Sequence, residues 1–156
     1  MECVLLGDVT ELQATTHTIE FPYTRTLGPV IGPFFTGLRD RQILGIRAGN
    51  RVLVPPLEYD PATGDALAPE FVEVGPGGTV TSWAWVTEPT RKHPLDRPFG
   101  FALIRLDGAD TAMVHAVDAG SADAMKTGMR VTAKWRDERK GRIDDIACFV
   151  PEGGAA

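Results

Sequence analysis

The spacing of apolar side chains predicts one helix near the start of the chain. Between residues 29 and 44, Ile31, Phe34 and Leu38 recur at positions i, i+3 and i+7, and Phe35 widens the same stripe. An isolated helix of this length is unstable in water. We therefore expect a helix over residues 29–44 that packing against other elements holds in place.

From residue 71 onward the pattern changes to strands. Apolar and polar residues alternate, and clusters of glycine and proline separate the runs. The expected strands are residues 71–74, 79–87, 99–106, 111–117, 128–136 and 143–150, with a short helix in residues 118–126. Five or six short antiparallel strands with one helical insertion predict a mainly β protein with a small closed barrel of the OB type. A β-sandwich is the competing architecture.

The alternation in residues 79–87 places Trp83 and Trp85 on one face of their strand and Ser82 and Ala84 on the other. Because the interior of a tight barrel favours small side chains, we expect the two tryptophans outside it. There they need a cover. Either the β-leaning N-terminal arm, residues 4–25, or another subunit supplies it.

The segment between helix and barrel has the outline of a zinc ribbon. Residues 45–64 contain a short strand, a turn, a second strand ending in Pro55 and Pro56, and a second turn at Asp60–Gly64. Tetrahedral zinc requires four thiolate or imidazole donors, and this segment contains no Cys or His. The expected units are an arm and helix (1–44), a metal-free ribbon-like segment (45–70), an OB barrel (71–151) and a disordered tail (152–156).

Composition narrows the classes of function. The net charge of −5 disfavours a protein that binds nucleic-acid phosphates. No apolar run is long enough to span a membrane, and the N-terminus lacks a signal-peptide pattern, so the expected compartment is the cytoplasm. The two cysteines, Cys3 and Cys148, are expected to be reduced and structural.

No catalytic constellation stands out. The three histidines, His17, His93 and His115, are scattered, and the sequence has no nucleophile elbow, P-loop or dinucleotide-binding fingerprint. His115 alternates with apolar residues on an expected strand, which favours a structural role. We expect a chain that is not an enzyme and that carries no metal or other cofactor.

Five segments in a fixed order resemble one family. They are residues 34–47, 51–56, 78–83, 101–108 and 127–131. Together they resemble the acyl-CoA-associated zinc-ribbon and OB-fold proteins over residues 29–151. In that family two C-x-x-C pairs hold zinc. Here residues 47–50 and 59–63 stand at those positions without cysteine, so we expect the packing of Val52, Val54, Leu57 and Tyr59 to replace the metal.

The resemblance implies a non-catalytic partner of a thiolase-like enzyme. That enzyme would be an aldolase or thiolase acting on acyl-CoA esters in steroid or lipid side-chain degradation, with acyl-CoA at the shared interface. The partner surface is expected to consist of Ile31, Phe34, Phe35, Leu38, Arg39, Arg41 and Tyr59. The loop residues Arg91, Lys92 and His93 are candidates for the CoA phosphates. Two alternatives remain open, a single-stranded nucleic-acid-binding OB protein and an independent acyl-CoA-binding module.

Overall fold

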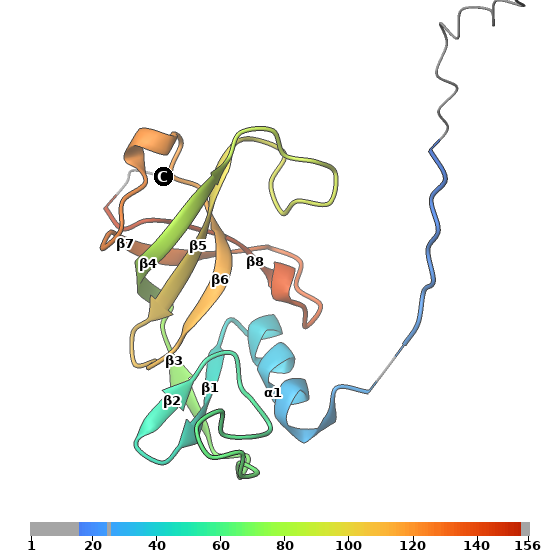
Figure 1. The fold of residues 1–156 in the computed structure, drawn as a ribbon, viewed down its shortest axis with the longest axis vertical. Coiled ribbons are helices and arrows are strands. Elements are labelled where there is room, and N and C mark those ends of the chain that lie inside the picture. The colour runs from blue at the N-terminus through green and yellow to red at the C-terminus, as the bar shows by residue number, and fades with distance from the viewer. Residues whose placement is uncertain (1–15, 25, 154–156) are drawn as a thin grey trace, which may run out of the picture.

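The computed structural model describes residues 16–24 and 26–153 (Figure 1). Its described part is mainly β, with one α-helix preceding a small three-stranded sheet and a closed five-stranded barrel. The predicted fold class is therefore confirmed. Residues 4–15 of the expected arm lie outside the described residues, whereas residues 16–24 are extended and exposed.

Helix α1 (Gly28–Arg39) is shorter than predicted. It ends in a turn in which the N–H groups of Asp40 and Gln42 donate to the carbonyl of Gly37, and Arg41 takes a left-handed conformation with φ of 64°. A Cβ on Gly37 would lie 3.0 Å from the Gln42 carbonyl oxygen, so this close return of the chain favours glycine. The apolar residues just after the turn belong to a strand, not to the helix.

The small sheet contains β1 (Ile43–Ala48), β2 (Arg51–Leu53) and β3 (Phe71–Val74), in the order β2-β1-β3. Strand β3 was expected at the start of the barrel, but it pairs antiparallel with β1, with Val74 opposite Ile43. The glycine-proline turn after Val74 redirects the chain, so that the barrel begins at Gly77.

The barrel contains five strands in the order β4-β5-β6-β8-β7, and it closes through pairing of β7 with β4. These strands are β4 (Gly77–Val86), β5 (Phe99–Leu106), β6 (Ala112–Val117), β7 (Arg130–Trp135) and β8 (Ile146–Pro151). The expected helical insertion is a single 3₁₀ turn, η1 (Ala122–Ala124). A second 3₁₀ turn, η2 (Ile143–Asp145), occupies the start of the last expected strand.

The two tryptophans lie on the opposite side of β4 from the one predicted. The pairing of β4 with β5 shifts between Val80 and Ser82, which reverses the side-chain alternation beyond that point. Trp83 and Trp85 then pair with the inward positions Ala102 and Gly100 and pack against the main core. Gly100 makes room for Met125, because a Cβ there would lie 2.7 Å from Cε of that residue. Ser82 and Ala84 are exposed instead. The tryptophans therefore need no cover from the arm or from another subunit.

One core joins the helix to the barrel. Phe34 and Leu38 of α1 are 2% and 0% exposed and belong to the same cluster as Val80, Ile104 and Phe149 of the barrel. A smaller cluster of Val30, Ile46, Ala48 and Leu53 packs the helix against the small sheet. The helix is thus buried between the two units, and its remaining surface faces outward beside both of them (Figure 1).

Candidate interaction surfaces

An ion pair joins the two turns of the ribbon-like segment. The Arg51 guanidinium Nη2 lies 2.7 Å from Oδ1 of Asp60, whose side chain is 14% exposed. The Asp60 carboxylate also accepts a hydrogen bond from the N–H of Ala62. This backbone donor, followed by Arg51, lowers the pKa of Asp60. Around the second turn, Tyr59 forms a β-bridge with Ala66.

The residues at the expected knuckle positions do not fit zinc. Residues 47–50 and 59–63 offer no thiolate or imidazole. In the described part of the chain, no group of three His, Cys, Asp or Glu side chains is placed to hold a metal ion. The ion pair and the turn hydrogen bonds instead link the elements that the metal would have joined.

Four side chains were expected to replace the metal by packing together, and only two of them are buried. Val52 and Val54 are 8% and 2% exposed, but Leu57 and Tyr59 are 42% and 60% exposed. The cis-proline segment before Leu57 carries the chain outward, toward the N-terminal end of α1. Leu57 and Tyr59 therefore contribute to a surface and not to the ribbon core.

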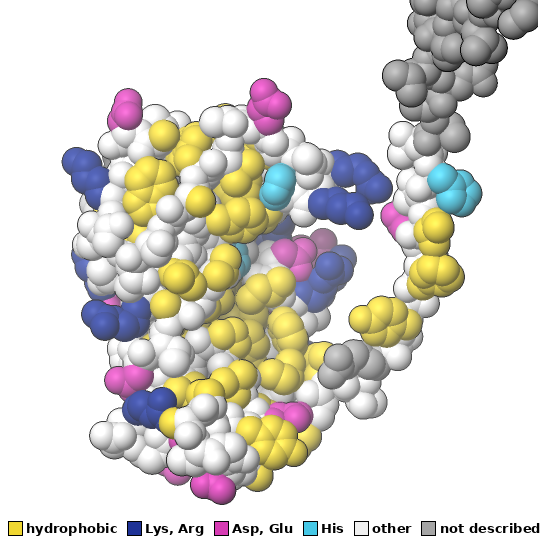
Figure 2. Space-filling view, viewed as in Figure 1, with side chains coloured by type: hydrophobic (Ala, Val, Ile, Leu, Met, Phe, Trp, Pro, Cys, Tyr) yellow, Lys and Arg dark blue, Asp and Glu magenta, His cyan; other side chains and the backbone are white. Residues whose placement is uncertain are grey.

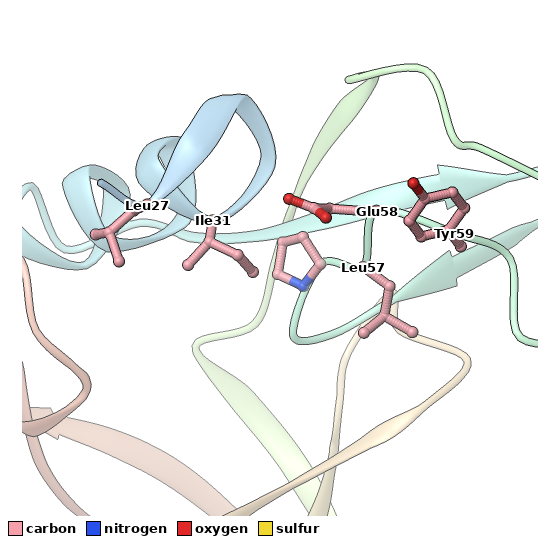
Figure 3. Close-up of a pocket in the computed structure, with 6 residues that line it drawn as sticks. Leu27, Ile31, Leu57, Glu58 and Tyr59 are labelled. Atoms are coloured by element: carbon pink, nitrogen blue, oxygen red, sulfur yellow. The ribbon is translucent and has the colours of Figure 1, made fainter. Parts of the chain in front are cut away.

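That surface is an open groove of about 570 Å³ (Figure 3). Leu27 and Ile31 line it from the start of the helix, and the segment that carries Leu57, Glu58 and Tyr59 lines it from the other side. The remaining lining residue is Pro56. The groove is apolar with one carboxylate, a composition suited to a protein contact.

The structure divides the residues expected at the partner surface. Phe34 and Leu38 belong to the part of the apolar stripe that faces the core. They are buried there and are unavailable to another protein. Ile31 and Tyr59 lie together in the groove. Arg39 and Arg41 are exposed at the far end of the helix, where Arg39 pairs with Asp40 at 3.1 Å. Phe35 is half-buried and packs edge-on against Phe34.

A second hollow, of about 400 Å³, lies between the loop joining β4 to β5 and the loop joining β7 to β8. Arg91, His93 and Pro94 line it from the first loop and Arg136 from the second, together with Asp96. Lys92 is exposed on the same loop but does not line the hollow.

His93 has a structural role within this loop. Its Nδ1 accepts a hydrogen bond from the N–H of Thr90 at 2.8 Å, and its ring packs 5.8 Å and 5.9 Å from the rings of Phe99 and Phe101. These contacts fix the loop, leaving Arg91 and Arg136 as the cations at the hollow. Arg136 was not predicted, because it lies far from Arg91 in the sequence and only the barrel topology brings the two together.

The outer face of β5 and β6 is largely aliphatic. Leu103 and Val114 are 40% and 60% exposed, and Ile143 of η2 is 44% exposed beside them. Figure 2 shows apolar side chains gathered in the middle of this view, continuing from the barrel toward the helix and small sheet, with charges around the rim. OB proteins bind oligonucleotides on this face by stacking bases on aromatic side chains. On this face Phe101 lies beside Leu103 and Val114, whereas Trp83 and Trp85 pack against the main core.

Two buried ionisable groups serve the fold. His115 is 7% exposed, its Nδ1 accepts the N–H of Ala116, and burial lowers its pKa. Burial also raises the pKa of the Cys148 thiol. Neither group lies beside a second residue with which it could form a catalytic pair in the described part of the chain. The expectation of a structural His115 agrees with these contacts.

Comparison with known families identifies the barrel. Residues 71–136 match the family model of the ChsH2 C-terminal OB-fold domain. Over these residues the chain is similar to that OB-fold domain. The resemblance predicted from the sequence is thus confirmed for the barrel, and the ribbon before it departs from the zinc-binding pattern at the cysteines.

Two solved structures are similar to this chain. One is a DUF35-family protein of unknown function from Sulfolobus solfataricus, 22% identical, covering 68% of this chain and 78% of its own, with a TM-score of 0.54. The other is the Ltp2-ChsH2(DUF35) aldolase, 21% identical, covering 76% of this chain and 91% of its own, also with a TM-score of 0.54. No curated protein matches the sequence. At these identities the structures establish a shared fold.

Among the described residues, no helix is long and apolar enough to cross a bilayer.

Proposed function

We propose that this chain is a non-catalytic partner subunit of a thiolase-superfamily enzyme. The enzyme would be an aldolase or thiolase that acts on acyl-CoA thioesters in steroid or lipid side-chain degradation. The observation that carries the proposal is the match of residues 71–136 to the ChsH2 C-terminal OB-fold domain, supported by the likeness of 76% of the chain to the Ltp2-ChsH2(DUF35) aldolase. The role of this chain is to stabilise its partner and support the partner's activity.

The groove beside α1 is the surface that we assign to the partner. Ile31 and Tyr59 line it, Phe35 lies half-buried one turn farther along the helix, and Arg39 and Arg41 lie at the far end of the helix. Interfaces commonly combine an apolar centre with aromatic and arginine anchors near it. Phe34 and Leu38 support this surface from within the core.

The hollow between the two barrel loops is the place that we assign to the CoA phosphates. Arg91 and Arg136 line it, and Lys92 adds a third positive charge on the same loop. Guanidinium groups bind phosphate through charge-assisted hydrogen bonds. Because His93 is engaged with Thr90, its expected contribution is to position the loop.

One observation favours a second candidate function, an independent acyl-CoA-binding module. The cationic hollow shares Pro94 with an apolar hollow of about 230 Å³ on the outer face of the barrel. An acyl chain could occupy the second while phosphate occupies the first. Calorimetric titration of the isolated chain with a long-chain acyl-CoA separates the two functions, because the module would bind without any partner.

Co-expression with a thiolase-like subunit encoded beside this chain tests the partner function. We expect the two chains to co-purify and the pair to cleave its acyl-CoA substrate, whereas this chain alone gives no turnover. Tyr59→Ala, on the exposed groove, should weaken association about tenfold or more while leaving the melting temperature of the isolated chain nearly unchanged. Arg39→Ala should also weaken association more than folding.

Lys126→Ala, an exposed substitution that lines neither the groove nor the two hollows, serves as the control for the groove variant. Turnover by this chain alone would refute the non-catalytic role. If association survives both Tyr59→Ala and Arg39→Ala, the partner contact lies elsewhere.

A further inference from the structure

The segment of residues 16–24, here called the arm, is extended and pairs with no strand of the described residues. Its apolar residues fall at every second position, and Ile19, Phe21 and Tyr23 are 66%, 82% and 83% exposed. Within the described residues, no backbone group of the arm has a hydrogen-bond partner. Figure 1 shows the arm running along one side of the molecule, clear of the helix and the barrel. Both its backbone and its apolar stripe are therefore available for binding.

The two backbone edges of the arm are not equivalent. In an extended strand, residues whose side chains share one face also direct their N–H and C=O groups toward the same edge. Ile19, Phe21 and Tyr23 thus present a complete set of donors and acceptors along one edge. Pro22 lies on the other edge and has no N–H. Proline in a sheet is tolerated where that side faces solvent, so the arm is suited to pairing along one edge only.

Two features place the arm next to the surfaces already described. Leu27, three residues after the described end of the arm, is the N-cap of α1 and lines the groove beside the helix, so the arm joins the rest of the chain at that groove. Farther along the arm, Oε1 of Glu20 lies 3.8 Å from Nη2 of Arg91 on the loop between β4 and β5. The arm therefore extends from the proposed partner groove toward the proposed phosphate hollow.

The described strand edges of this chain are poor acceptors for the arm of a second copy. The outer edge of β2 is already bonded, because Val52 and Val54 donate their N–H groups to Asp110 and Thr111, and the barrel is closed. The outer strand β3 carries Glu73, which has the same charge as the arm's Glu20, whereas Glu70 before it is paired with Arg47. The net charge of −5 further opposes self-association.

From these observations we propose that the arm adds as an edge strand to an exposed sheet edge of the thiolase-like partner. The backbone of Ile19, Phe21 and Tyr23 pairs with that edge, and their side chains pack on an apolar surface beside it. This inference rests on the proposed function, because it names the means by which the same partner is held. The partner is recognised by an unpaired strand edge flanked by apolar side chains.

The test measures binding of the purified full chain to the purified thiolase-like subunit by titration calorimetry. Phe21→Ala removes one apolar anchor and should weaken binding roughly 30-fold. Phe21→Pro removes the same ring and also the N–H on the pairing edge, so it should weaken binding by roughly a further tenfold. Thr18→Pro removes an N–H from the edge that Pro22 already blocks and should change the dissociation constant less than about threefold.

All three variants should keep the melting temperature of the parent chain, because the arm lies outside the core. Failure of the unaltered chain to bind overturns the proposed function together with this inference. Binding that is unaffected by Phe21→Ala overturns the arm alone and leaves the proposed function intact. Equal effects of Phe21→Ala and Phe21→Pro overturn the strand pairing, and a stable homodimer that Phe21→Ala dissociates overturns the choice of partner.

Discussion

The carboxylate of Asp145 organises the loop between β7 and β8. It is 3% exposed and accepts hydrogen bonds from the N–H groups of Lys140, Gly141 and Arg142 at 2.7–3.1 Å. Burial alone would raise its pKa, but the three backbone donors outweigh burial and lower it. One side chain thus satisfies three donors in the loop that also carries Arg136 of the proposed phosphate hollow.

Replacing this carboxylate should destabilise the chain. In Asp145→Asn, the amide retains one acceptor oxygen and turns its own donors toward backbone N–H groups, so we expect a loss of about 2–3 kcal/mol in the free energy of unfolding. Urea denaturation of the parent and the variant at pH 7 measures this loss. The neighbouring Asp144→Asn removes only an exposed ion pair with Arg142 and should cost less than about 1 kcal/mol.

The same pair of variants has a defined pH dependence. The pKa of Asp145 is lower in the folded chain than in the unfolded chain, so its ionised carboxylate stabilises the fold. This contribution to the free energy of unfolding is fully present above the unfolded pKa of about 3.9, and it is lost as the pH falls through the folded pKa. The difference between the parent and Asp145→Asn should therefore shrink below about pH 4. A difference that grows in acid would contradict this assignment of the carboxylate.

At the level of elements, an ion pair joins the two turns of the ribbon-like segment. Arg51 and Asp60 join the two turns at 2.7 Å, and Val52 and Val54 pack beneath them. We expect elemental analysis of chain purified without added zinc to show no stoichiometric metal, and chelation to leave the melting temperature unchanged. One tightly held zinc ion per chain would refute this account of the ribbon.

We expect the Arg51–Asp60 ion pair, and not a metal ion, to hold the second turn of the ribbon-like segment in place. Arg51→Ala leaves Asp60 without its guanidinium partner and should increase the amide hydrogen exchange of residues 59–66 while the barrel strands stay protected. Arg47→Ala removes an exposed pair with Glu70 in the same sheet and is the matched control. If both variants exchange alike, the Arg51–Asp60 pair has no special role.

The sequence predicted the elements better than their ends and faces. The barrel strands follow from alternation and turns, and the start of α1 follows from its apolar period. The end of α1 could not be predicted in this way, because the apolar residues of β1 continue the same period. Only the turn at Arg41 separates the helix from the strand. The tryptophans were placed on the wrong face because a shift in strand pairing between Val80 and Ser82 leaves no mark in local composition.

The candidate surfaces were predicted in part for a related reason. Ile31 and Tyr59 were named from the helix stripe and the ribbon, and the fold brings them to one groove. A stripe alone does not reveal which of its members are buried, so Phe34 and Leu38 were included with the surface residues. Arg136 was missed because its proximity to Arg91 depends on the closure of the barrel.

At the scale of the whole molecule, the proposed surfaces lie along one continuous path. The arm runs from the groove beside α1 to Arg91, where the loops of the barrel form the cationic hollow. A partner that holds the arm and the groove would therefore also lie next to Arg91 and Arg136. In the proposed complex, the barrel would thus contribute Arg91 and Arg136 to the interface.

Replacing Arg91 and Lys92 by alanine should raise the KM of the complex for its acyl-CoA thioester with little change in kcat. Phosphate contacts far from the reacting carbon bind the ground state and the transition state equally, so their loss appears in KM. Steady-state kinetics of the complex measures both constants. Because Arg91 also contacts Glu20, a Glu20→Ala variant is needed beside it; it should leave KM near the parent value.

A charge-matched control removes Arg105 and Lys126, which are exposed and do not line the hollow. If this control raises KM as much as the Arg91 and Lys92 variant, general attraction of the anionic CoA explains the effect, and the hollow loses its assignment. A variant of Arg91 and Lys92 with an unchanged KM would likewise remove the loop from the site. A fall in kcat at constant KM would place these residues near the reacting carbon, where a chain without a catalytic constellation has no reason to reach.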